Sequence, residues 1–128
     1  MASAAQWAIF VLSAMNWNTL TDTAQLDAID TASHKGPVLI FKHSTRCSIS
    51  SAALNRLESA WTLEDAAEHT VHYLDVLKYR PLSNLIADRY AVQHESPQVL
   101  VVRDGRCVHV SNHFGITYSD TVAALERA

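Results

Sequence analysis

The fold is decided by residues 37–50, whose sequence is PVLIFKHSTRCSIS. After the break at Gly36-Pro37, four apolar residues follow without interruption, from Val38 to Phe41. A short continuous run rich in β-branched and aromatic residues is typical of a strand that is buried on both faces of a sheet. The next residues, Lys42 to Ser48, are mostly polar and predict a loop that leads out of this strand.

A helix is predicted directly after this loop and ends near Trp61. Its residues Ile49, Ala53, Leu57 and Ala60 are spaced by four, four and three positions. This spacing places them on one face of a helix. The loop therefore joins the end of a buried strand to the start of a helix.

Strands and helices alternate over the rest of the chain. Pro81 suits the first turn of a helix, and Asp104-Gly105 is a strong signal for a two-residue hairpin turn. The predicted elements are a helix over Asp22–Ala32, a strand over Val71–Val76, a helix from Arg80, strands over Gln98–Arg103 and Arg106–Ser111, and a helix over Thr117–Arg127.

This order of elements predicts the fold class. The first strand, the helix after it and the next strand form a βαβ unit, which requires parallel strands and a right-handed crossover. The last part is an antiparallel hairpin followed by a helix. We therefore expect an α/β protein with a thioredoxin-like fold, in which helices flank a central mixed four-stranded sheet and a C-terminal β-hairpin and helix close the chain.

Length and composition favour one globular domain. The 128 residues suit a single domain, and an apolar fraction of 48% supports a real core. The formal charge of -3 argues against a nucleic-acid partner, since such proteins usually carry a basic patch. We expect the domain to span residues 15–128.

Residues 1–14 are expected to form an apolar extension outside that domain. No charged side chain occurs from Met1 to Met15, and the apolar run Trp7 to Leu12 is far shorter than the ~20 residues that span a bilayer. A secretory signal would begin with positive charge, whereas the first Lys or Arg is Lys35. A signal or membrane-surface segment remains the alternative, and we expect no membrane partner.

The chain has only two cysteines, Cys47 and Cys107. A secreted disulfide scaffold of this size would usually contain four or more, so we expect a reducing, cytoplasmic location. The predicted hairpin strand runs about 20 Å from its start to the turn beside Cys107. Because a disulfide needs Cα atoms within roughly 7 Å, we interpret Cys107 as a packed sheet residue, not as a partner of Cys47.

Cys47 is the candidate nucleophile. At the start of a helix, unpaired backbone N–H groups and the helix dipole favour the thiolate, which is the reactive form. Arg46 directly precedes Cys47, and Lys42 and His43 lie close by in sequence, so these residues could add positive potential. Ser50 stands three residues on, where it could hydrogen-bond the thiolate. The alternative, an ordinary buried cysteine, is disfavoured by the polar neighbours.

The motif is thus Cys-x-x-Ser, which has no second thiol. A mixed disulfide on Cys47 would have to be resolved by an outside thiol.

Ser96-Pro97 is the second candidate element. It lies just before a predicted strand, where a thioredoxin fold places a cis proline beside the active-site cysteine. We therefore predict a cis Ser96–Pro97 bond near Cys47, with Ser96 offering backbone groups to an extended substrate. An ordinary proline at a strand entrance is the alternative.

Thr45-Arg46-Cys47-Ser48-Ile49-Ser50 resembles the Thr-Cys-Pro-Ile-Ser motif of the YtxJ-type proteins of the bacillithiol system, the monothiol bacilliredoxins. The resemblance continues through residues 51–54, 95–98 and 112–117 and covers roughly residues 15 to 127. Two departures are Arg46, inserted between threonine and cysteine, and Ser48, where proline often stands.

This resemblance implies a thiol–disulfide oxidoreductase with a thioredoxin fold. Cys47 would be catalytic and would take bacillithiol, its co-substrate, from S-thiolated client proteins, and a separate reductant would regenerate it. No metal and no tightly bound cofactor are implied. Arg46 fits an anionic low-molecular-weight thiol, and the other supporting or substrate-binding residues are Thr45, Ser48, Ser50, Ser96 and Pro97.

Two other functions remain open. A Cys-x-x-Ser site can bind an iron–sulfur cluster between two subunits, with Cys47 and a small thiol as ligands. The chain could also be a redox-inactive module that holds extended peptides at Pro97. His69 and His72 are interpreted as surface residues rather than zinc ligands. His113 could contact the thiol ligand or could be an exposed loop residue.

Overall fold

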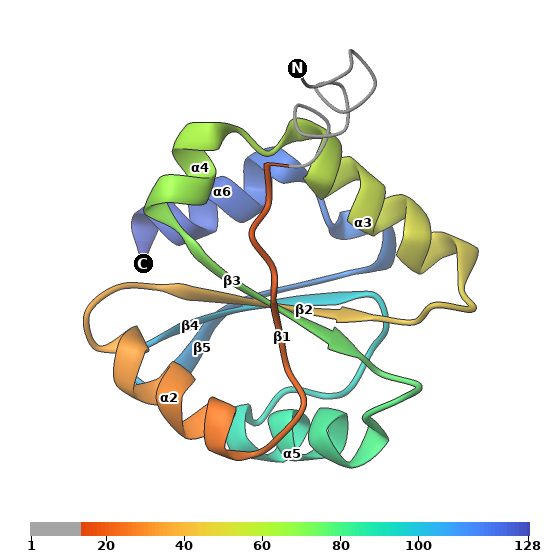
Figure 1. Ribbon diagram of the computed structural model, residues 1–128, viewed down its shortest axis with the longest axis vertical. Helices are drawn as coiled ribbons and strands as arrows, with labels where there is room; N and C mark the ends of the chain where they lie inside the picture. Colours follow the sequence, from red (N-terminus) through yellow and green to blue (C-terminus); the bar gives the residue numbers. More distant parts are fainter. Residues whose placement is uncertain (1–13) are drawn as a thin grey trace, which may run out of the picture.

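Five strands form one mixed sheet in the computed structural model, which describes residues 14–128 (Figure 1). Their order is β1-β3-β2-β4-β5; β1, β2 and β3 run parallel, and the pairs β2/β4 and β4/β5 are antiparallel. The strands are β1 (Asn18–Thr19), β2 (Val38–His43), β3 (Thr70–Asp75), β4 (Gln98–Arg103) and β5 (Arg106–Asn112). The predicted mixed sheet is confirmed, with one strand more than expected.

The additional strand is β1, which pairs with β3 at the edge of the sheet. It consists of only Asn18 and Thr19, so it shows no alternating apolar pattern. Its pairing depends on the edge that β3 presents, which lies more than fifty residues away. That is why the prediction of four strands was wrong.

Helices cover both faces of the sheet. Figure 1 shows α3, α4 and α6 on one face and α2 and α5 on the other. Their bounds are α2 (Ala24–Ser33), α3 (Ser48–Ala60), α4 (Leu63–Glu68), α5 (Arg80–Tyr90) and α6 (Tyr118–Arg127), and a short 3-10 helix, η1 (His113–Gly115), precedes α6. The short helix α4 was not predicted. It has too few residues for a periodic pattern, and it starts with a capping box between Thr62 and Asp65.

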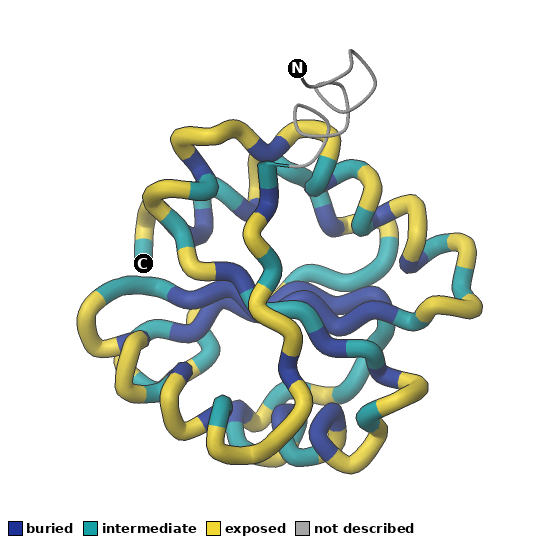
Figure 2. The backbone as a smooth tube through the Cα atoms, in the orientation of Figure 1, coloured by how far each residue is buried: buried dark blue, intermediate teal, exposed yellow. Residues whose placement is uncertain are grey.

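Strand β2 supplies both layers of the core. Leu39 and Phe41 pack toward α3, whereas Val38 and Ile40 pack toward α2 and α5. All four are fully buried, as predicted, because successive strand residues point to opposite faces and both faces are covered. Figure 2 shows the same continuous burial along the central strands.

The hairpin between β4 and β5 also follows the prediction. Asp104 and Gly105 both have positive φ, 54° and 72°, as a two-residue hairpin turn requires. The extension expected over residues 1–14 lies outside the described residues, except for Ala14. Met15 is 6% exposed and belongs to the core layer beside α3. No helix within residues 14–128 is long and apolar enough to cross a bilayer.

Candidate active site

Cys47 lies at the N-cap of α3, as predicted. Its backbone N–H donates to the Ser44 carbonyl at 3.1 Å, and its own carbonyl accepts from Ser51 N–H at 3.0 Å. The residue is partly exposed, and its thiol makes no capping hydrogen bond. The thiol therefore stands free beside the N–H groups of the first turn, which favour negative charge there.

Strand β2 continues two residues further than predicted, through Lys42 and His43. Both pair with β3, Lys42 opposite Leu74 and His43 opposite Asp75, and both are buried. The loop that leads to Cys47 therefore starts at Ser44. The polarity of these two side chains predicts a loop, but in the folded protein Lys42 donates to Ser83, 41 positions away, and His43 contacts Ser50, seven positions away.

Lys42 points away from the Cys47 loop, toward α5. Its ammonium donates to the Ser83 carbonyl at 3.1 Å and lies 3.3 Å from His94 Nδ1. Burial lowers the pKa of Lys42 to about 8. The expectation that Lys42 adds positive potential beside Cys47 is therefore wrong, because the alternation of β2 sends its side chain to the opposite face.

His43 points to the same face as α3. Its Nδ1 lies 2.7 Å from the Ser50 hydroxyl, and its ring packs near Phe41 and Tyr73, with ring centroids 6.2 and 5.7 Å apart. Burial lowers the pKa of His43, and the nearby carboxylates of Asp75 and Glu58 partly oppose that effect. The expected positive charge on His43 is thus disfavoured by its own burial.

Ser50 is fully buried beneath the start of α3. Its oxygen accepts from Ser44 N–H at 3.0 Å in addition to the contact with His43. Ser50 therefore ties the first turn of α3 to both the strand and the loop. A hydrogen bond from Ser50 to a Cys47 thiolate stays a prediction.

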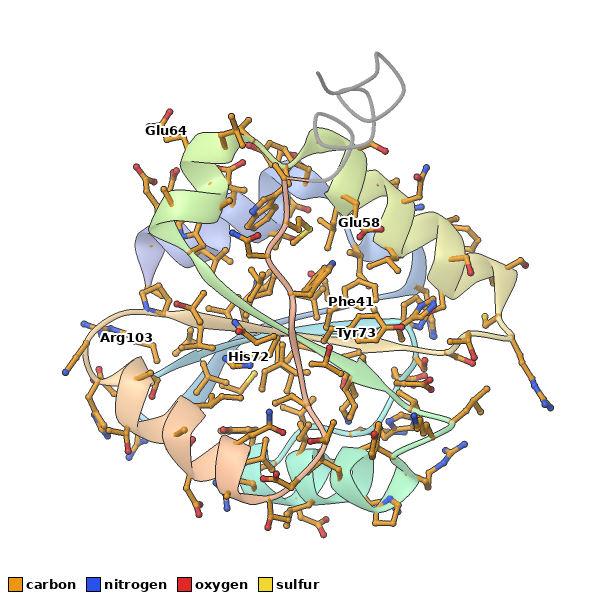
Figure 3. All side chains as sticks on the ribbon, viewed as in Figure 1. Phe41, Glu58, Glu64, His72, Tyr73 and Arg103 are labelled. Atoms are coloured by element: carbon orange, nitrogen blue, oxygen red, sulfur yellow. The ribbon has the colours of Figure 1, made fainter. Side chains whose placement is uncertain are left out.

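An aromatic and acidic group surrounds His43. Trp17 packs against Phe41 and Tyr73, with ring centroids 5.9 and 6.0 Å apart, and its indole N–H donates to Glu58 at 3.2 Å. Figure 3 shows Phe41 and Tyr73 close together on the sheet, with Glu58 on the α3 side. Sequence reasoning missed Trp17 and Glu58, because only the tertiary fold brings them to this place.

The Ser96–Pro97 bond is cis, as predicted. Gln98, the next residue, pairs with Lys42, so Pro97 lies opposite the His43 end of β2. This is the end from which the chain leads to Cys47. Among the residues that the structure describes, the buried Ser96 hydroxyl has no hydrogen-bond partner.

The segment after β5 closes the same end of the sheet. His113 has a φ of 51°, and its N–H donates to the Pro97 carbonyl at 3.0 Å. Its ring lies 3.4 Å from Glu95, and its side chain is 44% exposed. Arg56 of α3, which sequence reasoning missed, donates to the carbonyls of His113 and Ile116 at 3.3 and 2.9 Å. These bonds hold α3 against the segment that contacts Pro97.

The remaining predicted residues are exposed around Cys47. Thr45, Arg46 and Ser48 are all exposed. None of the ion pairs found among residues 14–128 involves Arg46. Their roles toward a ligand stay predictions.

Cys107 lies at the other end of the sheet. It pairs with Val102, which pairs with Val38 at the start of β2, whereas Cys47 follows the end of β2. Both thiols are free. Burial raises the pKa of Cys107, and its thiol donates to the His109 carbonyl at 3.3 Å. The interpretation of Cys107 as a packed sheet residue is confirmed.

No group of three or more His, Cys, Asp or Glu side chains within the described range could hold a metal ion.

Comparisons with known proteins agree with this geometry. A family model described as monothiol bacilliredoxin BrxC matches residues 18–121. A solved structure described as a candidate oxidoreductase with a thioredoxin fold is 28% identical, with a TM-score of 0.69, and the match covers 83% of this chain and 90% of that one.

Two thioredoxins share the fold at low identity. Thioredoxin f from spinach chloroplast is 13% identical, with a TM-score of 0.66 and coverage of 91% of this chain and 95% of that one. Thioredoxin from Malassezia sympodialis is 14% identical, with a TM-score of 0.65 and coverage of 88% and 90%. The predicted thioredoxin fold is therefore confirmed.

Proposed function

This chain belongs to the monothiol bacilliredoxin family, and on that premise we propose that it removes bacillithiol, or a similar small thiol, from mixed disulfides of client proteins through Cys47. Its fold and its family make it a thiol oxidoreductase of the thioredoxin-like type. The identity of the small thiol and the role of Cys47 are the parts that we propose.

The reaction is a thiol–disulfide exchange. The Cys47 thiolate attacks the bacillithiol sulfur of the client's mixed disulfide, and a new S–S bond joins Cys47 to bacillithiol. The bond between bacillithiol and the client breaks, and the client sulfur leaves with the electron pair and takes up a proton. The client is thus reduced, and Cys47 is oxidised to a mixed disulfide.

A second thiol must then regenerate the protein. Ser50 stands where a resolving cysteine would be, so no internal disulfide can form at the motif. A separate thiol reductant attacks the bacillithiol sulfur on Cys47, and the Cys47 thiolate leaves. The outgoing product is a disulfide between bacillithiol and that reductant.

The observation that supports this proposal is the position of Cys47. It caps a 13-residue helix at the end of the sheet where the cis Ser96–Pro97 bond also lies. We assign Ser96 and Pro97 to contact with the extended client segment. Thr45, Arg46 and Ser48 flank Cys47 in the sequence and are exposed, and the Arg46 guanidinium suits an anionic small thiol.

The test is a de-thiolation assay on a client protein that carries bacillithiol on a single cysteine. Mass spectrometry follows the loss of bacillithiol from the client and its appearance on this protein. We expect Cys47→Ser to abolish the transfer and Cys107→Ser, the matched control, to leave it unchanged. Transfer that persists in Cys47→Ser would contradict the proposal.

The same assay with clients that carry glutathione or coenzyme A measures the choice of small thiol. Faster release of bacillithiol than of either alternative is expected.

A further inference from the structure

We propose that His43 accepts the thiol proton of Cys47 through the hydroxyl of Ser50, so that a thiolate and an imidazolium form together at the start of α3. This inference rests on the proposed role of Cys47 as the nucleophile. It gives His43 a role in proton transfer in addition to its packing in a buried strand.

The hydrogen bonds of Ser50 suggest the relay. A hydroxyl has one proton to donate and two lone pairs to accept with. The Ser50 oxygen accepts Ser44 N–H at 3.0 Å and lies 2.7 Å from His43 Nδ1. When His43 is neutral with Nδ1 unprotonated, Ser50 must donate its only proton to that nitrogen. When Nδ1 carries a proton, Ser50 accepts from both neighbours and its own proton becomes free.

The free proton is available on the side of Cys47. Cys47 is the N-cap of α3 and Ser50 is the third residue of the helix. The side chain of an N-cap residue can reach the backbone of the third helical residue. The thiol makes no capping hydrogen bond in this structure. The relay therefore requires a rotation about the Cα–Cβ bond of Cys47 that brings its sulfur to the Ser50 hydroxyl.

The proton transfer balances without any outside group. The Cys47 S–H bond and the Ser50 O–H bond break, while a new Ser50 O–H bond and an Nδ1–H bond on His43 form. The thiolate then accepts a hydrogen bond from Ser50, and Ser50 accepts one from the imidazolium. The net charge of the site is unchanged. When regeneration releases Cys47 as a thiolate, the same path can return the proton.

The groups around His43 determine how far the proton-transfer equilibrium lies toward the imidazolium. Burial disfavours the imidazolium, whereas Glu58 on α3 and Asp75 on β3 favour it by their negative charge. Tyr73, also on β3, packs beside the ring, and Lys42 points to the opposite face toward Ser83. The two carboxylates therefore compensate part of the burial cost when His43 becomes charged.

The first measurement is the titration of the His43 ring by NMR, in a Cys107→Ser background. Linkage requires that a thiolate at Cys47 raises the proton affinity of His43 as much as the imidazolium favours the thiolate. We expect His43 to hold its proton to a pH about one unit higher than in Cys47→Ser, a coupling of about tenfold. Ser50→Ala should remove most of this difference, since it removes the bridging hydroxyl.

The second measurement is the rate of Cys47 alkylation by iodoacetamide at pH 7. His43→Asn keeps an acceptor near the position of Nδ1 but cannot take up a proton, so we expect the rate to fall about tenfold. Ser50→Ala should reduce it similarly, and the double variant should be no slower than either single variant, because both act in one path. His94→Asn, a change at a partly buried histidine beside Lys42, is the matched control and should leave the rate unchanged.

Three results would overturn the relay. The first is a His43 titration that is the same with and without the Cys47 thiol. The second is a difference that persists in full in Ser50→Ala, which would show that the charges act through space. The third is a loss of alkylation rate in the double variant that equals the two single losses combined. Failure of the proposed function looks different, since the unaltered protein would then fail to release bacillithiol while the coupling between Cys47 and His43 could still be measured.

Discussion

The two ends of the sheet bury polar groups in different ways. At the hairpin end, Ser33 of α2 is fully buried, and its hydroxyl accepts Gly105 N–H at 2.8 Å. Its carbonyl accepts Asp104 N–H at 2.9 Å, so these bonds satisfy the backbone of a turn. At the Cys47 end, the buried polar side chains of Lys42 and His43 can change their charge. The bonds of Ser33 stabilise the hairpin turn, whereas the Cys47 end keeps two basic side chains in the core, where a positive charge is costly.

The largest expected effect is the change of unfolding free energy with pH that the buried Lys42 causes. The pKa of Lys42 falls from the ordinary 10.5 to about 8 in the folded protein. Between these values the unfolded chain binds more protons than the folded one, so the free energy of unfolding rises with pH. Lys42→Met should remove this rise and leave the packing volume nearly unchanged.

The measurement is urea unfolding of both proteins from pH 7 to 10.5. Relative to Lys42→Met, the unaltered protein should gain about 3 kcal/mol across this interval, with no comparable gain below pH 7. His34→Asn, a change at an exposed residue near the hairpin, is the control, and we expect no comparable gain for it. If the difference in unfolding free energy between the unaltered protein and Lys42→Met does not change with pH, burial of the Lys42 ammonium has no cost.

The next effect compares the two thiols. Cys47 is free at a helix N-terminus, whereas burial raises the pKa of Cys107 at the hairpin end. In the native protein at pH 7, we expect iodoacetamide to modify Cys47 at least about tenfold faster than Cys107. Mass mapping of the two cysteine peptides over time gives both rates. Equal alkylation rates for Cys47 and Cys107 in the native protein would contradict this difference between the two ends of the sheet.

The smallest effect is purely structural and belongs to the hairpin end. Gly105 has a φ of 72°, and a Cβ there would meet no atom within 4 Å. Gly105→Ala should therefore cost about 1 kcal/mol of unfolding free energy through backbone strain alone. Thermal unfolding measures this loss, and Cys47 alkylation should proceed at the unaltered rate. Gly36→Ala, where no positive φ occurs and space is open, is the matched control.

Local sequence patterns predicted the parts of the fold that local forces determine. The apolar run Val38–Phe41, the Asp104-Gly105 turn, the helix start at Cys47 and the cis bond before Pro97 are all confirmed. Each has a signal within a few residues: a continuous apolar run, a turn dipeptide, or a proline in a known context.

Tertiary partners account for the parts that the sequence did not predict. The polarity of Lys42 and His43 predicts a loop, yet both lie inside the sheet, where Lys42 contacts the distant Ser83 and the fold of the α3 start brings Ser50 to His43. Arg56 contacts carbonyls about sixty positions away, and no local sequence pattern predicts such a contact. The residues assigned to bind the small thiol remain predictions for the assays above.

The contact between Ser33 and the hairpin also bears on the order of assembly. Gly105 lies 72 positions from Ser33, so the hydroxyl can meet the turn only after a long stretch of chain has been brought together. Contacts of such separation form slowly, because loop closure costs entropy before the contact repays it. Once made, this contact secures a surface turn to the body of the protein. The amide hydrogens of Asp104 and Gly105 should therefore exchange with solvent as slowly as those of the central strands, although they sit at the tip of a hairpin.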